Sequence, residues 1–223
     1  MSPDLAWQGS LFDGGPPSAD ISFADLRRID LDDRSWVDYA PGWLAGSDAL
    51  FAQLLDAGSW QQRQVWMYER TVAEPRLTAG WSTELGGLPE PLAALAEPLS
   101  ARYTVDFDRI WVNLYRDGSD SVAWHGDRTR TVMTAPLVAT VSLGARRRFV
   151  LRPTGSGRIA HELRPGHGDL VVMGGACQSE WEHAVPKQAG VVGPRMSVTI
   201  RHSRPAPGER WLREPTSTRP GHA

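Results

Sequence analysis

Apolar and polar side chains alternate with a period of two along most of the chain after residue 105. In residues 195–201, for example, Met196, Val198 and Ile200 face one side and polar residues face the other. Such alternation is typical of strands with one buried face. Short turns containing glycine or proline separate the apolar runs. The pattern predicts strands over residues 107–115, 122–125, 136–143, 147–152, 159–163, 169–174, 180–185 and 195–201.

The first half of the chain shows helical periodicity at two places. Apolar residues recur at helical spacing between Trp43 and Leu55, with Ser47 as the candidate N-cap and Gly58 as the candidate stop. A second apolar face, made by leucines and an alanine, predicts a helix over residues 89–103.

Eight or so short strands without helices between them indicate a mainly β (α+β) protein, either an all-β sandwich or a double-stranded β-helix (jelly roll), with supporting N-terminal helices. We expect residues 1–60 to form an acidic, partly disordered extension and residues 61–205 to form the jelly-roll domain. Residues 206–223 should be a flexible tail. Residues 64–69 indicate a short strand, whereas residues 74–81 indicate a loop.

The charge is close to balanced, with a formal net charge of −2, but it is unevenly distributed. Aspartates dominate residues 1–60, whereas residues 128–164 contain many arginines and a single acidic residue, Glu162. The arginine block either faces an anionic partner such as nucleic acid or forms a solvated surface, since Lys187 is the only lysine.

Cys177 is the only cysteine, which excludes a disulfide framework and a cysteine-based zinc site. No segment has the length and apolarity of a membrane span, and the N-terminus lacks the basic start of a signal peptide. We expect a cytoplasmic monomer with no membrane partner.

His125 and Asp127 stand two residues apart directly after a polar-faced strand. On an extended segment this spacing places an imidazole and a carboxylate on the same side. Together with one distant histidine, they would form the facial triad that suits non-heme Fe(II). The same spacing is common in turns, so the pair indicates a metal site only if a third ligand exists.

His183 is the candidate third ligand because it lies near the end of a predicted strand, shortly before a proline. A competing pair, His167 and Asp169, has the same spacing as His125 and Asp127. It follows a Pro-Gly turn and precedes an apolar strand, so we interpret it as a structural turn.

Arg195 and Arg201 lie on the polar face of the last predicted strand. Arginines on the inward face of a strand are costly unless they meet an anion. Six residues of strand separate the two by about 20 Å, so both cannot grip the same carboxylate. One could clamp the far carboxylate of a dicarboxylic acid, and the other could brace the site nearer the metal. A rim of solvated arginines is the alternative.

Together these residues resemble the AlkB family of Fe(II)- and 2-oxoglutarate-dependent dioxygenases. The resemblance runs from about Tyr68 to Arg204, and several ordered blocks carry it. These blocks are Pro75-Arg76-Leu77-Thr78, Asn113-Leu-Tyr115-x-Asp-Gly, His125-x-Asp127, Val141-Ser-Leu-Gly144, His167-Gly-Asp-Leu170, His183-x-Val-Pro-Lys187 and Pro194-Arg195-x-Ser-x-Thr-x-Arg201.

The resemblance implies a role for each block. Iron would be held by His125, Asp127 and His183, while His167 and Asp169 would lie outside the metal site. The co-substrate 2-oxoglutarate would be surrounded by Asn113, Tyr115, Arg195, Ser197 and Arg201, with Arg195 pairing its distal carboxylate.

For the substrate, the resemblance places Trp81 in a covering loop and Arg76 near the nucleic-acid backbone. Thr129 occupies a position where relatives that repair DNA commonly carry an acidic residue that touches the base. This departure leaves the iron chemistry intact but puts the base preference in doubt.

The implied activity is oxidative demethylation of 1-methyladenine and 3-methylcytosine in DNA or RNA, with release of formaldehyde, succinate and CO2. The cofactors would be Fe(II), 2-oxoglutarate and O2, and the base would have to be flipped out or single-stranded. Thr129 and the near-neutral charge favour an alternative oxygenase that acts on a protein, lipid or small molecule. A noncatalytic jelly-roll binding module is a further alternative.

Overall fold

The computed structural model describes residues 5, 9, 15–67, 69–127, 133, 135–190, 193–205 and 207. The N-terminal elements are β1 (Ser18–Ala19), β2 (Arg27–Asp30), β3 (Ser35–Ala40), β4 (Leu44–Ala45), α1 (Ser47–Ala57), β5 (Gln64–Met67), β6 (Arg70–Ala73), β7 (Leu77–Ser82), the 3-10 turn η1 (Thr83–Leu85) and α2 (Glu90–Tyr103). They are followed by β8 (Phe107–Tyr115), β9 (Val122–His125), β10 (Val138–Gly144), β11 (Phe149–Pro153), β12 (His161–Leu163), β13 (Leu170–Gly175), α3 (Cys177–Glu180), β14 (Trp181–Val185) and β15 (Arg195–His202).

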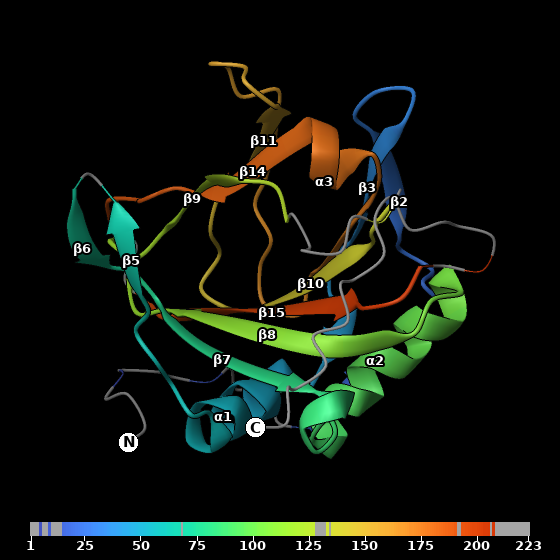
Figure 1. Ribbon diagram of the computed structural model, residues 1–223. Helices are drawn as coiled ribbons and strands as arrows, with labels where there is room; N and C mark the ends of the chain where they lie inside the picture. The colour runs from blue at the N-terminus through green and yellow to red at the C-terminus, as the bar shows by residue number, and fades with distance from the viewer. Residues whose placement is uncertain are drawn as a thin grey trace, which may run out of the picture.

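Two antiparallel sheets form the body of the protein. The larger has the strand order β2-β3-β13-β10-β15-β8-β7, and the smaller has the order β12-β11-β14-β9. Figure 1 shows the sheets facing each other, with α1 and α2 against the outer face of the larger one. This arrangement confirms the expected jelly roll with supporting helices.

Alternation along β8 divides the larger sheet into an apolar and a polar face. Ile110, Val112 and Leu114 are buried in the core that includes the apolar face of α2. Each such side chain contributes about 1.5–3 kcal/mol when it leaves water. The alternate residues therefore point to the opposite side, into the space between the sheets, and the site is built there.

The N-terminal segment differs from the expected extension of residues 1–60. β3 pairs with β13 along six residues, and β2 pairs with β3, so both strands belong to the larger sheet. Phe51 of α1 is fully buried. α1 begins after Gly46, which adopts a left-handed conformation with φ 66°, so Ser47 is not the N-cap.

The loop expected over residues 74–81 is also corrected. Residues 77–82 form β7, the edge strand that pairs with β8. Gly80 suggested a loop, but within β7 it makes room for a large neighbouring side chain. A methyl group at Gly80 would lie 2.5 Å from the ring of Trp111.

Among the described residues, no helix is long and apolar enough to cross a membrane. The tail expected over residues 206–223 lies, except for residue 207, outside the described residues.

Candidate active site

His125, Asp127 and His183 meet at one end of the smaller sheet. His125 ends β9, Asp127 follows it, and β14 pairs with β9 so that His183 lies directly opposite His125. One ligand atom from each residue lies within 4.8 Å of the others. The Nε2 atoms of both histidines lie 3.8 Å from oxygens of Asp127. Two imidazoles and a carboxylate in this arrangement can hold a divalent metal and leave further positions open.

The charges around this cluster favour its metal-binding form. Burial would raise the pKa of Asp127, but the nearby positive charges, first that of Arg201, hold it below its ordinary value. Arg201 donates a hydrogen bond of 2.6 Å from Nη2 to Asp127. Burial lowers the pKa of His183 to about 4, so its imidazole is neutral at physiological pH. A carboxylate and a neutral imidazole are the forms that ligate metals.

The backbone near the cluster is held by contacts that the sequence did not predict. The Nδ1 atom of His125 lies 2.8 Å from the carbonyl oxygen of Ala123, which orients the ring. The backbone N–H of Asp127 donates to Oε1 of Gln178 at 3.0 Å. A methyl group at Gly126 would lie 2.6 Å from the carbonyl oxygen of Gln178. Glycine at position 126 therefore permits the close approach of α3.

The cluster opens into a cavity of about 620 Å³ between the two sheets. This volume lies in the range of ordinary small-molecule sites. Its walls carry many polar and basic groups on strands of both sheets. The lining residues are Arg63, Arg76, Arg109, Trp111, Asn113, Tyr115, Val122, His125, Asp127, Thr140, Phe149, His183, Val185, Arg195, Ser197, Thr199 and Arg201.

The two central strands of the larger sheet set the order of groups along the cavity. β8 and β15 pair antiparallel, and their cavity-facing residues form successive rungs. The rung beside Asp127 contains Arg201, and Arg195 lies three rungs away. This is the separation that the strand spacing predicts for the two arginines. The four rungs are Tyr115 with Arg195, Asn113 with Ser197, Trp111 with Thr199, and Arg109 with Arg201.

Arg195 is a buried cation with free hydrogen-bonding capacity at the far end of the cavity. It is 2% exposed, and its Nη2 group donates to Oγ of Ser142 at 2.9 Å. Among the described residues, its Nε and Nη1 groups have no hydrogen-bond partner. A buried guanidinium with unpaired N–H groups is costly unless an anion completes it. This end of the cavity therefore fits a carboxylate.

The middle of the cavity is lined by neutral polar groups. Asn113 donates to Oγ of Ser197 at 3.4 Å. Arg76 donates from Nε to Oδ1 of Asn113 at 3.2 Å and also pairs with Glu74 at 2.9 Å. Arg76 therefore forms part of the cavity wall and bonds inward.

Of the remaining expected substrate contacts, Trp81 is placed elsewhere and Thr129 lies outside the described residues. Trp81 lies on β7, where it pairs with Ile110 of β8. Its side chain packs against the core on the helical side of the larger sheet. It does not line the cavity, so the expected covering role of Trp81 is corrected. The tryptophan that lines the cavity is Trp111, together with the aromatic residues Tyr115 and Phe149. The alternation along β8 could have identified it, because Trp111 shares a face with Asn113.

The competing pair, His167 and Asp169, has structural contacts, as its sequence context suggested. Asp169 accepts hydrogen bonds from Tyr39, from the backbone N–H of Gly42 and from that of Gly166. The Nδ1 atom of His167 accepts one from the backbone N–H of Gly144 at 2.7 Å.

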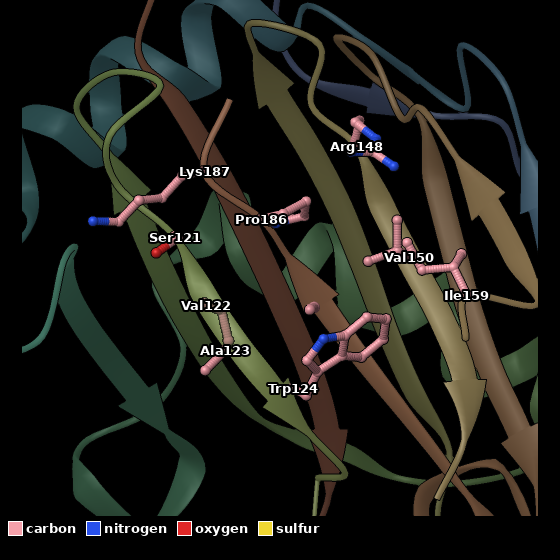
Figure 2. Close-up of a pocket in the computed structure, with 10 residues that line it drawn as sticks. Ser121, Val122, Ala123, Trp124, Arg148, Val150, Ile159, Pro186 and Lys187 are labelled. Carbon is pink, nitrogen blue, oxygen red and sulfur yellow. The ribbon is translucent and has the colours of Figure 1, made fainter. Parts of the chain in front are cut away.

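A second, smaller pocket of about 250 Å³ lies on the smaller sheet, away from the cluster of His125, Asp127 and His183, which we call the metal-type cluster. Figure 2 shows Trp124, Val150, Ile159 and Lys187 around it. None of the three candidate metal ligands lines this pocket. The cavity between the sheets is therefore the candidate active site.

Comparisons with known proteins agree with this geometry. The family model described as "2OG-Fe(II) oxygenase superfamily" matches residues 39–201. The chain is 34% identical over 200 residues to alpha-ketoglutarate-dependent dioxygenase alkB homolog 3 of Bos taurus, covering 79% of this chain and 70% of that protein. It is 28% identical over 214 residues to DNA oxidative demethylase ALKBH2 of Mus musculus, covering 86% and 89%.

The fold is also similar to that of a solved prolyl hydroxylase from Trichoplax adhaerens, with a TM-score of 0.55 and 13% sequence identity. The match covers 74% of this chain and 82% of that one. The chain thus belongs to the 2OG-Fe(II) oxygenase superfamily, and within it to the AlkB homologues. It is a dioxygenase that uses Fe(II), 2-oxoglutarate and O2. The His-Asp-His cluster fits Fe(II), and the buried Arg195, whose Nε and Nη1 groups have no partner among the described residues, fits 2-oxoglutarate.

Proposed function

We propose that this protein removes N-linked methyl groups from nucleic-acid bases by oxidation, with 1-methyladenine and 3-methylcytosine as its substrates. The observation that carries the proposal is the cavity itself. The same cavity contains three side chains arranged to bind a metal, and the buried Arg195, whose Nε and Nη1 groups have no partner among the described residues. It also contains Trp111, which lies near basic side chains. The name of the murine relative, a DNA oxidative demethylase, supports the same chemistry.

In this proposal, each group along the cavity has one task. His125, Asp127 and His183 hold the iron. With 2-oxoglutarate and O2, iron held by these residues would supply the oxidising power for hydroxylation of the N-methyl group. The hydroxylated group leaves as formaldehyde, which restores the unmodified base, while 2-oxoglutarate is converted to succinate and CO2.

The rungs of β8 and β15 orient the co-substrate. Arg195 pairs with the distal carboxylate of 2-oxoglutarate, and Tyr115 lies beside this pair, since the Arg195 guanidinium carbon is 5.1 Å from its ring centroid. Asn113 and Ser197 bind the middle of the molecule. Arg201 keeps Asp127 ionised and in place through their hydrogen bond.

The substrate base has to leave its stack to reach the iron. The metal-type cluster lies between the sheets, and His183 and Asp127 are almost fully buried side chains. A base inside a duplex cannot approach such a site, so the substrate is a flipped or single-stranded nucleotide. Arg76 and Arg109 line the cavity, where each is also paired with a glutamate, and in this proposal they contact a nearby phosphate.

The test is incubation with oligonucleotides that carry one methylated base, in DNA and RNA and in single- and double-stranded form. We expect formaldehyde and the unmodified base to appear only with Fe(II) and 2-oxoglutarate present. The Asp127→Ala variant should form neither product. Succinate formation that no methylated oligonucleotide stimulates would contradict the proposal.

That outcome would favour a second candidate, a 2-oxoglutarate oxygenase of a protein, lipid or small molecule. The net charge of −2 favours it, because a protein near neutrality has no general attraction for nucleic acid. The pairing of Arg109 with Glu84 further reduces the positive charge at the cavity.

A further inference from the structure

Trp111 is a half-buried aromatic side chain on the wall of the cavity that also holds His125, Asp127 and His183. It lines the cavity, and its partner on β15 is Thr199. Thr199 is two residues from Arg201, which contacts Asp127 at 2.6 Å. Trp111 is therefore one rung from the arginine that contacts Asp127, on the wall of the same cavity.

Gly80 fixes the position of the Trp111 ring. The two residues are partners across β7 and β8. A methyl group built on Gly80 would lie 2.5 Å from one ring carbon of Trp111 and 2.6 Å from another. The benzo half of the indole thus lies over the bare backbone of β7, in space that any larger residue at position 80 would occupy.

The described residues that line the cavity offer a cationic base no free carboxylate. Five arginines line the cavity, two of them paired with Glu74 and Glu84, and Asp127 is the only carboxylate among the described residues that line it. Asp127 is already committed to Arg201 and to the metal-type cluster. A methyl group on N1 of adenine or N3 of cytosine leaves the base positively charged at neutral pH. A group other than a free carboxylate must therefore bind the positive charge of the base.

Building on the proposed function, we propose that Trp111 is the specificity-determining residue for cationic methylated bases, with Gly80 as its positioning residue. The face of an indole attracts a cation placed within about 6 Å of its centre. Arg63 already lies over this ring, with its guanidinium carbon 5.9 Å from the centroid. A flat, charged base can make the same contact over a larger area.

The proposal is tested by comparing two lesions that differ mainly in charge. In the same oligonucleotide, 3-methylcytosine is cationic and 3-methylthymine is neutral. The quantity measured is the ratio of kcat/KM for the two lesions. We expect Trp111→Leu to lower this ratio by about tenfold, the range of a partly desolvated cation–π contact. Trp111→Phe, which keeps an aromatic face, should lower it less.

Gly80→Ala gives an independent second test. The added methyl group must displace the Trp111 ring, so the ratio should fall without any change to the indole itself. Trp81→Leu is the matched control, because Trp81 lies on the next strand but packs against the core. The ratio for this variant should equal that of the wild type.

The outcomes separate this inference from the proposed function. If Trp111→Leu lowers kcat/KM equally for both lesions, or leaves the ratio within twofold of wild type, the inference is overturned and the demethylase function stands. If the wild-type protein turns over neither lesion, the proposed function falls, and this inference with it.

Discussion

Replacing Arg195 with methionine should separate co-substrate binding from folding. Arg195 is 2% exposed and has two N–H groups with no partner among the described residues. Loss of one partner from a buried, hydrogen-bonded charge pair costs about 2–5 kcal/mol of binding free energy. The Kd for 2-oxoglutarate should therefore rise by roughly thirtyfold to several thousandfold.

The same substitution should leave the empty protein at least as stable as the wild type. Replacing an incompletely paired buried charge by an apolar side chain is often neutral or stabilises by about 1–4 kcal/mol. Without 2-oxoglutarate, the free energy of unfolding should be unchanged or higher. With saturating 2-oxoglutarate, the wild type should gain thermal stability, whereas the variant should gain little.

The assay is a 2-oxoglutarate titration with a redox-inert divalent metal in place of iron, together with thermal unfolding. Arg147→Met is the matched control, because Arg147 is also buried but donates to the carbonyl oxygens of Asp117, Asp120 and Pro186. This control should be destabilised by roughly 3 kcal/mol, since it leaves buried carbonyl groups unpaired. A Kd for Arg195→Met within threefold of the wild-type value would refute the reasoning.

Three further predictions concern the metal site, the half-buried Tyr39 and the buried Cys177. Asp127→Ala should abolish tight Fe(II) binding, whereas Asp169→Ala should retain it. Asp169→Ala should instead lose roughly 3 kcal/mol of stability, because it removes three hydrogen bonds. The opposite pattern in metal titrations would show that His167 and Asp169 are the metal-binding pair. Burial raises the pKa of Tyr39 to about 12. The stability that the neutral Tyr39 side chain contributes should therefore be complete below the ordinary tyrosine pKa near 10 and disappear as the pH rises toward 12. Alkaline unfolding curves of the wild type and of Tyr39→Phe measure this contribution. Burial raises the pKa of Cys177 to about 12, so iodoacetamide should label this thiol only after unfolding; rapid labelling of the native protein would contradict its burial.

Periodicity predicted the parts of the fold that depend on local pattern. β8 and β9 occupy the predicted residues, and α2 buries the predicted apolar face. The cavity follows from the same pattern, because the polar face of β8 had to point away from the core. The separation of Arg195 from Arg201 also follows from strand geometry alone.

The errors arose where distant residues decide the local structure. Gly80 suggested a loop, but the indole of Trp111 requires glycine inside a strand at that position. The N-terminal segment of residues 1–60 was expected to be an acidic, partly disordered extension. Asp38 is nevertheless buried in β3, where Arg28 and Tyr103 bond to its carboxylate.

The contact between Gln178 and Asp127 could not be predicted either. It depends on how α3 packs beside the loop after β9, and no pattern around residue 178 indicates this contact. Buried polar partners of this kind are set by the assembled fold and leave no periodic signal in the sequence.

Mass spectrometry of a methylated oligonucleotide, together with succinate quantified in the same reaction, tests the central claim most directly. The account predicts that one methyl group is lost for each succinate formed above the level without oligonucleotide. It also predicts that Asp127→Ala abolishes both products. Succinate formation at the same rate with methylated and unmethylated strands, with no change in the mass of the methylated strand, would contradict it.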